Sequence, residues 1–392
     1  MPAPDTPAKP TAEPWLAVLD RPVALDRLDI FEIVVPQTET FRSAVGVRRE
    51  RRALFVRWQD PEGAWGVGEC SCRPDPFFSG EFVDGAYDVL QSYIFPLLPR
   101  RGTIRDVVTA LRRIRGWPFT CSAVLDALFD LGRRQGLPDP LDLWPGEAIP
   151  HVPVGISLGI FDAPQQAVDR VARSVEEGYR RVKMKIAPTM DPSPLAAVRD
   201  AFPDLVLGFD ANGSCGSDDL PFLVSLAELR PHVLEQPFAP SRLDLCRDLR
   251  HLVPDLRICL DETLTDAGVL TAAHDLDALD EVNLKPGRVG GPLESLRILG
   301  LCRDLGLPAW VGGMFETGVG RRANLRYAAR LPEAVAHDLS PSHRYFARDV
   351  VNEPIRMSAD GTVDLRDDRP VELDDDAVAD MTKRRCELVK TD

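Results

Sequence analysis

The chain has 392 residues, of which 44% are hydrophobic and 28% charged, a composition typical of a globular protein. Its formal net charge of −14 at pH 7, without a basic tract that carries interleaved aromatic residues, argues against a nucleic-acid-binding surface. No apolar run approaches the length of a membrane span.

Eight cysteines are scattered along the chain and lack the regular spacing of a disulfide framework. Cys70 and Cys72 form one CxC pair, and no second pair of cysteines or histidines is spaced to complete a zinc site with them. We therefore expect buried thiols and a protein of the reducing cytoplasm.

The first part of the chain predicts a short tail followed by an α+β domain over residues 18–146. The start of the chain is rich in Pro, Ala and Thr and has no apolar core, which predicts a disordered tail over residues 1–17 rather than a signal peptide. Alternating apolar runs then predict antiparallel strands, and apolar residues at helical spacing predict helices. The expected strands lie within residues 25–56 and 65–70, and the expected helices span residues 82–98, 103–115 and 122–135.

The middle of the chain carries charged residues at a nearly constant interval. The steps from Lys185 to Asp210, to Glu235, to Asp261 and to Lys285 are 25, 25, 26 and 24 residues, and each charge ends a short apolar run. A strand of about 5 residues, a helix of about 11 and two short loops add up to roughly this interval. The spacing therefore predicts repeated βα units that close into a barrel, with the charged residues at the C-terminal rim where such barrels do chemistry.

The other expected strands extend this barrel over residues 147–346. The first strand is expected at residues 152–158, followed by a helix over 164–177, and the eighth strand at 334–338. Near the seventh strand, Gly312 and Gly313 place bare backbone at the rim, where a ligand can approach closely. Beyond this barrel, the strand-like VDL and VEL runs within residues 347–392 suggest that the C-terminal segment returns to the N-terminal domain.

The rim residues suggest a chemistry of their own. Three carboxylates without His or Cys form an all-oxygen site that suits Mg²⁺ or Mn²⁺ rather than zinc. A divalent ion there can hold a substrate carboxylate and neutralise the charge that develops when the α-proton leaves. Lysine is a poor base at its free pKa, which is about 10.4. Positive charge from Lys183 and from the metal is expected to lower the pKa of Lys185. Because Lys185 and Lys285 lie on opposite sides of the acids, together they can move a proton across one α-carbon and invert it.

The motifs KMK, DAN, EQP, DE, NLKPGRVGG and GGMFETGVGR resemble those of the enolase superfamily, in its muconate-lactonising subgroup. Within that subgroup the chain is most similar to the branch of N-acylamino acid racemases and o-succinylbenzoate synthases. The segments FRSAVG, WGVGEC and FFSGEFVDGA fit the capping domain of that branch. The resemblance implies a (β/α)₇β barrel covered by an α+β N-terminal capping domain, and we expect a homo-oligomer that acts on a small carboxylate.

The resemblance also implies roles for individual residues. Asp210, Glu235 and Asp261 would hold the metal, and Lys185 and Lys285 would be the two acid/base groups. Lys183 would help to hold the substrate carboxylate and tune Lys185. The positions where the family contacts substrate are Ser157, Asn212, Gly312, Gly313 and Met314, together with Val45 and Phe78 in the capping loops.

Three positions depart from the family pattern. Cys215 and Phe78 stand where the family often has Tyr, and Val45 stands where it often has an aromatic residue. These changes leave the acids and lysines intact and are expected to alter the wall of the pocket.

The leading functional hypothesis is racemisation of N-acylated, in particular N-succinylated, amino acids by the two lysines. The main alternative is o-succinylbenzoate synthase, a lyase of menaquinone synthesis that begins with the same α-proton abstraction. A muconate-type cycloisomerase and a dipeptide epimerase are weaker alternatives. A non-catalytic relative that only binds a carboxylate would be expected to have lost a ligand or a base, and none is lost here.

Overall fold

The computed structural model describes residues 13–391, and its central element is a curled sheet of seven parallel strands. The strand order is β13-β12-β11-β10-β9-β8-β7, so each strand pairs with its neighbours in the sequence. This confirms the expected α/β fold with a curled parallel sheet. The parallel strands are β7 (Ile156–Leu158), β8 (Arg181–Lys185), β9 (Val206–Asp210), β10 (Val233–Glu235), β11 (Ile258–Leu260), β12 (Glu281–Leu284) and β13 (Ala309–Val311).

Two residues join the edges of this parallel sheet. Asp338 forms a parallel bridge with Gly312 after β13, and His337 forms one with Val154 before β7. The eighth strand expected over residues 334–338 is therefore reduced to two residues, with no longer strand at this place. The backbone N–H of Asp338 donates to the carbonyl of Val311 at 3.0 Å, which brings the Asp338 side chain to the same rim as the other acids.

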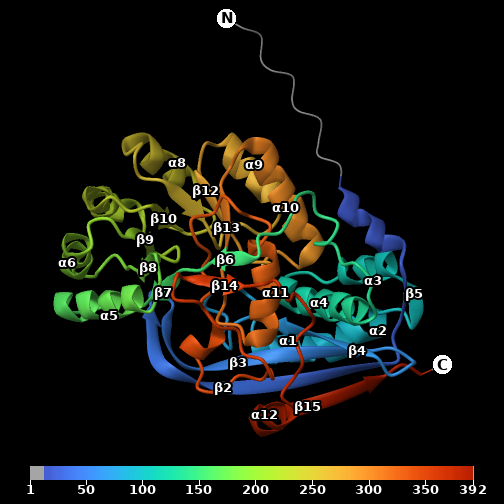
Figure 1. Ribbon diagram of the computed structural model, residues 1–392. Coiled ribbons are helices and arrows are strands. Elements are labelled where there is room, and N and C mark those ends of the chain that lie inside the picture. Colours follow the sequence, from blue (N-terminus) through green and yellow to red (C-terminus); the bar gives the residue numbers. More distant parts are fainter. Residues whose placement is uncertain (1–12, 392) are drawn as a thin grey trace, which may run out of the picture.

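Helices connect successive parallel strands and cover the outside of the parallel sheet. Strands β10, β11 and β12 are buried at every position, as expected when one face packs on helices and the other lies inside a curled sheet. Figure 1 shows these helices on the outer side of the strands. They are α5 (Pro164–Glu176), α6 (Ser193–Ala201), α7 (Leu220–Ser225), α8 (Leu243–Leu252), α9 (Ala267–Asp275) and α10 (Pro292–Leu305), with 3₁₀ turns η3 (Ser217–Asp219) and η4 (Leu226–Leu229). After β13 come α11 (Gly318–Ala328) and, beyond the bridge at Asp338, the 3₁₀ turn η5 (Ser342–Arg344).

A second, antiparallel sheet has the order β15-β2-β3-β4 and lies along the lower edge of the molecule in Figure 1. Its C-terminal strand β15 alternates between half-buried and exposed residues, the pattern of a strand with one face on the protein. The strands are β2 (Arg27–Ser43), β3 (Gly46–Gln59), β4 (Trp65–Cys70) and β15 (Thr382–Val389). The nearby helices are α1 (Val83–Val89), the π-helix η2 (Leu90–Ile94), α2 (Phe95–Leu97), α3 (Ile104–Leu111), α4 (Pro118–Arg134) and α12 (Asp375–Met381).

The C-terminal segment returns to the N-terminal domain through the expected VEL run, where the carbonyl of Val371 accepts from Arg134 of α4, and through β15, but not through the VDL run. The VDL run forms β14 (Thr362–Asp364), which pairs with β6 (His151–Pro153) next to the parallel sheet. The strand expected at residues 152–158 is accordingly split into β6 and β7. Strand β15 instead pairs with β2, and the short strands β1 (Pro22–Ala24) and β5 (Arg101–Thr103) pair with each other.

The predicted disordered tail over residues 1–17 is wrong where the structure can test it. Residues 1–12 lie outside the described residues, but Pro14–Asp20 forms the 3₁₀ helix η1. Trp15 is 1% exposed, and its ring lies 5.1 Å from that of Trp144. The Pro- and Ala-rich composition of the start of the chain conceals this apolar anchor.

The antiparallel sheet reaches the rim of the parallel sheet through the hairpin of β2 and β3. The backbone N–H of Ile160, after β7, donates to the carbonyl of Arg42 at 3.0 Å, and Arg42 also pairs with Asp162. A second connection runs from the buried Glu69 of β4, which accepts from the hydroxyl of Thr317 at 2.7 Å at the start of α11. These contacts fix the hairpin tip beside the charged residues.

Among the described residues, the structure contains no helix that is both long and apolar enough to cross a membrane.

Close packing of β4 on α4 sets the position of the loop that follows β4. A Cβ added at Gly68 would lie 2.1 Å from the carbonyl oxygen of Ala123 and 2.8 Å from the amide nitrogen of Ala127, both backbone atoms of α4. We predict that Gly68→Ala lowers the free energy of unfolding in urea by about 1–3 kcal/mol, the cost of overpacking. Gly80→Ala is the control, because nothing lies within 4 Å of its added Cβ, and we expect a change of about 0.5 kcal/mol or less. Equal effects of the two substitutions would contradict the close contact.

Candidate active site

Three carboxylates meet at the C-terminal end of the parallel sheet. Asp210 and Glu235 end β9 and β10 and are direct partners in the strand register, and Asp261 follows β11. All three residues are 0% exposed, and one oxygen from each lies within 4.8 Å of the others. The adjacent parallel strands thus bring together the residues that are about 25 positions apart in sequence.

Lys185 and Lys285 flank this group of acids on opposite sides. The Nζ atom of Lys185 on β8 donates to Oδ2 of Asp210 at 2.5 Å. The Nζ atom of Lys285, which follows β12, donates to Oδ2 of Asp261 at 2.7 Å. Successive strands therefore carry base, acid, acid, acid and base in the order expected from the sequence.

Lys183 lies deeper than either flanking lysine. It is 3% exposed, and its Nζ atom lies 2.6 Å from Oε2 of Glu235, 3.3 Å from Asp210 and 2.5 Å from Asp338. Asp338 was not singled out from the sequence, because its strand is too short to leave an alternating pattern. These three carboxylates compensate the buried ammonium group of Lys183.

The proximity of these charges shifts their pKa values. Burial alone would raise the pKa of Asp210, but the ammonium groups of Lys185 and Lys183 outweigh burial and hold this pKa below its usual range. Burial lowers the pKa of Lys185, Asp210 opposes this shift, and the charge of Lys183 reinforces it. Burial also disfavours the charged form of Lys183, but Asp338 and Glu235 reverse that effect and raise its pKa. Lys183 is therefore a fixed positive charge, whereas Lys185 loses its proton more easily than an ordinary lysine.

Two further residues, not expected from the sequence, contact the acids. Asn283 on β12 donates through Nδ2 to Oε1 of Glu235 at 2.8 Å. The guanidinium group of Arg288 contacts Asp261 and donates to the backbone carbonyls of Asn283 at 2.7 Å and Leu264 at 2.9 Å. Asn283 lies two residues before Lys285. Because residues two apart on a strand point to the same face, this spacing could have indicated that Asn283 faces the acids.

The donor set fits a hard divalent cation. The three buried side chains offer only carboxylate oxygens, the ligands that Mg²⁺ and Mn²⁺ prefer. Nearby, the buried Oε2 of Glu262 has no hydrogen-bond partner, which leaves one more oxygen unsatisfied in the same region. The arrangement can hold a metal ion.

A cavity bordered by Lys183, Lys185 and Lys285 is lined by most of the residues expected to contact substrate. Ser157 on β7 contributes a buried hydroxyl without a hydrogen-bond partner, and Asn212 donates to Glu262 at 2.9 Å while its own Oδ1 has no partner. Such unsatisfied buried groups are rare in proteins and are expected where a ligand supplies the missing bond. The expected contact residues that line the cavity are Val45, Phe78, Ser157, Asn212, Gly313 and Met314.

Gly312 does not line this cavity, contrary to expectation. A Cβ at Gly312 would lie 2.3 Å from Oδ1 of Asn283, so the missing side chain makes room for the residue that holds Glu235. At Gly313 an added Cβ would lie 2.5 Å from Nη1 of Arg321. The bare backbone of Gly312 thus accommodates the side chain of Asn283, whereas Gly313 borders both Arg321 and the cavity.

The departures from the family pattern fall in two different places. Val45 and Phe78 line the cavity, and the ring of Phe78 lies 5.0 Å from Nζ of Lys285. Cys215 is 6% exposed and forms a bridge with Phe238, and it is not part of the cavity lining. Only the first two positions can alter the pocket wall directly.

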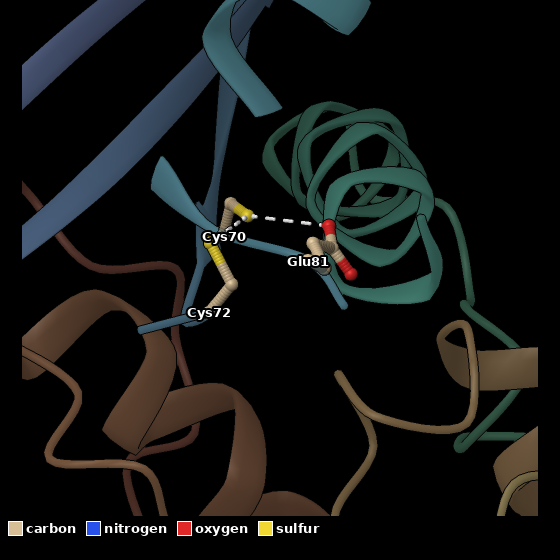
Figure 2. A group of neighbouring side chains, drawn as sticks. All are labelled: Cys70, Cys72 and Glu81. Atoms are coloured by element: carbon tan, nitrogen blue, oxygen red, sulfur yellow. Dashed lines mark hydrogen bonds between the residues drawn. The ribbon is translucent and has the colours of Figure 1, made fainter. Parts of the chain in front are cut away.

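Cys70 and Cys72 form a buried cluster with Glu81 at the end of β4 (Figure 2). Their Sγ atoms lie 3.6 Å apart, and both cysteines are free thiols, as expected. Glu81 accepts hydrogen bonds from the backbone N–H groups of Phe119 at 2.8 Å and Thr120 at 2.6 Å, at the start of α4. Its carboxylate thus caps α4 and is already satisfied.

The chain is similar to proteins of a known family. The family model described as Enolase C-terminal domain-like matches residues 166–377, which include all three acids and all three lysines. The chain belongs to the enolase superfamily. A solved structure of an enolase superfamily member from Listeria innocua matches with a TM-score of 0.86 and 28% identity, covering 93% of this chain and 99% of the other.

Relatives of this chain are named for two kinds of reaction, racemisation and o-succinylbenzoate synthesis. The chain is 38% identical over 327 residues to an N-succinylamino acid racemase of Thermus thermophilus, covering 82% of this chain and 87% of the relative. It is 34% identical over 335 residues to an o-succinylbenzoate synthase of Enterococcus faecalis, covering 84% and 90%. The two reactions expected from the sequence are therefore both represented among its relatives.

The three acids yield a prediction for metal binding. We expect Glu235→Gln to weaken binding of Mn²⁺ at least about tenfold, because one charged ligand is lost. Glu281→Gln is the control, since Glu281 is also a buried carboxylate but lies at the start of β12, at the opposite end of that strand from the three acids. Mn²⁺ binding followed by electron paramagnetic resonance measures both variants. If Glu235→Gln and the wild type bind Mn²⁺ equally well, these acids are not the metal site.

Proposed function

We propose that the protein abstracts a proton α to a carboxylate in a metal-dependent reaction, and that it racemises N-acyl, in particular N-succinyl, amino acids. The observation that carries this proposal is the placement of Lys185 and Lys285 on opposite sides of three buried carboxylates. A proton can then leave one face of an α-carbon and return to the other.

Asp210, Glu235 and Asp261 would hold Mg²⁺ or Mn²⁺. When bound, the ion supplies positive charge that neutralises the substrate carboxylate as negative charge develops on it. Loading of this site would also free the lysines from the ion pairs with Asp210 and Asp261, so that both Nζ atoms can face the substrate.

In the proposed reaction, one lysine is neutral and the other is protonated. The neutral Nζ takes the α-proton from its own face of the substrate, and the protonated Nζ donates a proton to the opposite face. Lys185 begins the reaction with one enantiomer and Lys285 with the other. Lys183 keeps its charge throughout, lowers the pKa of Lys185 and helps to hold the substrate carboxylate.

The proposed architecture separates chemistry from substrate selection. A (β/α)₇β barrel over residues 147–346 carries the acids and lysines, and an α+β capping domain over residues 18–146 supplies Val45 and Phe78. Strand β15 of the segment 347–392 adds to the sheet of the capping domain. The remaining substrate contacts in this proposal are Ser157, Asn212, Gly313 and Met314.

A second candidate is the o-succinylbenzoate synthase reaction, favoured by the relative of that name at 34% identity. It begins with the same proton abstraction and uses the same acids. In that reaction Lys185 would act as base and then as acid, whereas Lys285 would only stabilise the negative charge. The behaviour of the two lysines therefore distinguishes the two candidates.

Each lysine should be indispensable for racemisation but not for exchange. We predict that Lys185→Ala and Lys285→Ala each reduce racemisation of an N-succinylamino acid by about 10²- to 10⁴-fold, the usual contribution of general acid–base catalysis. In deuterated water each variant should still exchange the α-proton of one enantiomer, and the preferred enantiomer should be opposite in the two variants. Proton NMR on both enantiomers measures the exchange.

Lys383→Ala is the control for these variants, because Lys383 is an exposed lysine on β15 that pairs with Glu32. It should racemise like the wild type. Equal loss of exchange for both enantiomers in each active-site variant would reject the two-base mechanism.

A further inference from the structure

Arg48 lines the same cavity as the catalytic lysines, although it belongs to the antiparallel sheet. It lies on β3, two residues after that strand begins, on the hairpin whose tip contacts the residues after β7. Its side chain is half-buried and takes part in the cavity wall with Phe41, Ser43 and Val45 of the same hairpin. The hairpin therefore contributes a positive charge as well as an apolar wall.

Every other cation of the cavity lining has a carboxylate partner. Lys183, Lys185 and Lys285 pair with the acids, and Arg321 pairs with Glu316 at 2.9 Å. Within residues 13–391, no hydrogen bond or ion pair joins the Arg48 guanidinium to another residue, and the group lies over the ring of Phe315. Arg48 is thus a cavity charge without a compensating anion.

The surroundings of Arg48 do not offer a substitute anion. The charge of Asp75 favours protonated Arg48, but Asp75 is held by Arg73 through hydrogen bonds of 2.7 and 2.9 Å. Burial lowers the pKa of Arg48 to about 9, and the charges of Arg73 and Arg51 act in the same direction. The group still carries its proton at neutral pH, and a partly buried, unpaired charge gains from an incoming anion.

An aromatic wall holds the Arg48 side chain in place. Its guanidinium carbon lies 5.4 Å from the ring centre of Phe315. Phe315 has a φ of +61°, a conformation that a bulky residue rarely adopts, and its ring is held by Phe41 at 4.9 Å and Tyr345 at 4.6 Å. The result is an apolar surface that ends in a fixed positive charge, which suits a short aliphatic chain ending in a carboxylate.

We propose that Arg48 binds a second carboxylate of the substrate, the free end of its succinyl group. This inference rests on the proposed function, in which the first carboxylate and the α-carbon lie between Lys185 and Lys285. Both candidate substrate classes contain a succinyl group, so the assignment applies to either reaction. Arg48 is in this role a specificity-determining residue rather than a catalytic one.

The test compares ligands that differ only in the second carboxylate. Binding of N-succinyl-L-phenylalanine and N-acetyl-L-phenylalanine to the Mg²⁺-loaded protein is measured by calorimetry for the wild type and for Arg48→Gln. We expect Arg48→Gln to weaken binding of the succinyl compound by about 10- to 100-fold, the range for a hydrogen bond to a charged group, and that of the acetyl compound by less than about threefold. Arg49→Gln is the matched control, because Arg49 is exposed on the same strand.

A third ligand, N-acetyl-L-glutamate, carries its second carboxylate on the amino acid side chain. A loss confined to this ligand in Arg48→Gln would overturn the assignment to the acyl end. Equal loss for the succinyl and acetyl compounds, or no loss for either, would also overturn it. A wild-type protein that exchanges no α-proton would reject the proposed function. The role of Arg48 would still be decided separately, because its test measures binding of the succinyl compound relative to the acetyl compound.

Discussion

Three carboxylates that are fully buried within 4.8 Å of one another impose the main constraint on this protein. Their mutual repulsion in a site of low polarity would prevent ionisation unless positive charge stood beside them. Lys183 and Lys185 supply that charge from β8 on one side of the acids, and Lys285 supplies it from the end of β12 on the other. In the proposed function, the same lysines act as acid and base once a bound metal ion neutralises the acids.

The parallel strands position the acids and lysines, whereas the hairpin and loops form the cavity wall. Parallel strands hold their side chains rigidly, and the register of Lys185, Asp210 and Glu235 on β8, β9 and β10 fixes the reacting groups. The cavity wall comes from the hairpin of β2 and β3 and from the loop after β4, which can change without moving the acids.

The sequence predicts the acids and lysines well because strand periodicity and chain spacing are local properties. It does not predict contacts that depend on three-dimensional closure. Asp338 belongs to a strand of two residues, and the role of Gly312 depends on the amide of Asn283, which approaches it from β12. In the sequence, Arg48 is one of several neighbouring arginines and has no distinguishing feature. Only the folded structure shows that it lines the cavity. The oligomeric state stays a prediction.

The central claim is that this protein inverts the α-carbon of an N-succinylamino acid. The most direct measurement is the optical rotation of N-succinyl-L-phenylalanine incubated with the Mg²⁺-loaded wild-type protein. The account predicts that the rotation decays to zero while the concentration of the compound stays constant, and that removal of the metal with a chelator stops the decay. A rotation that stays constant across a panel of N-succinylamino acids would contradict it.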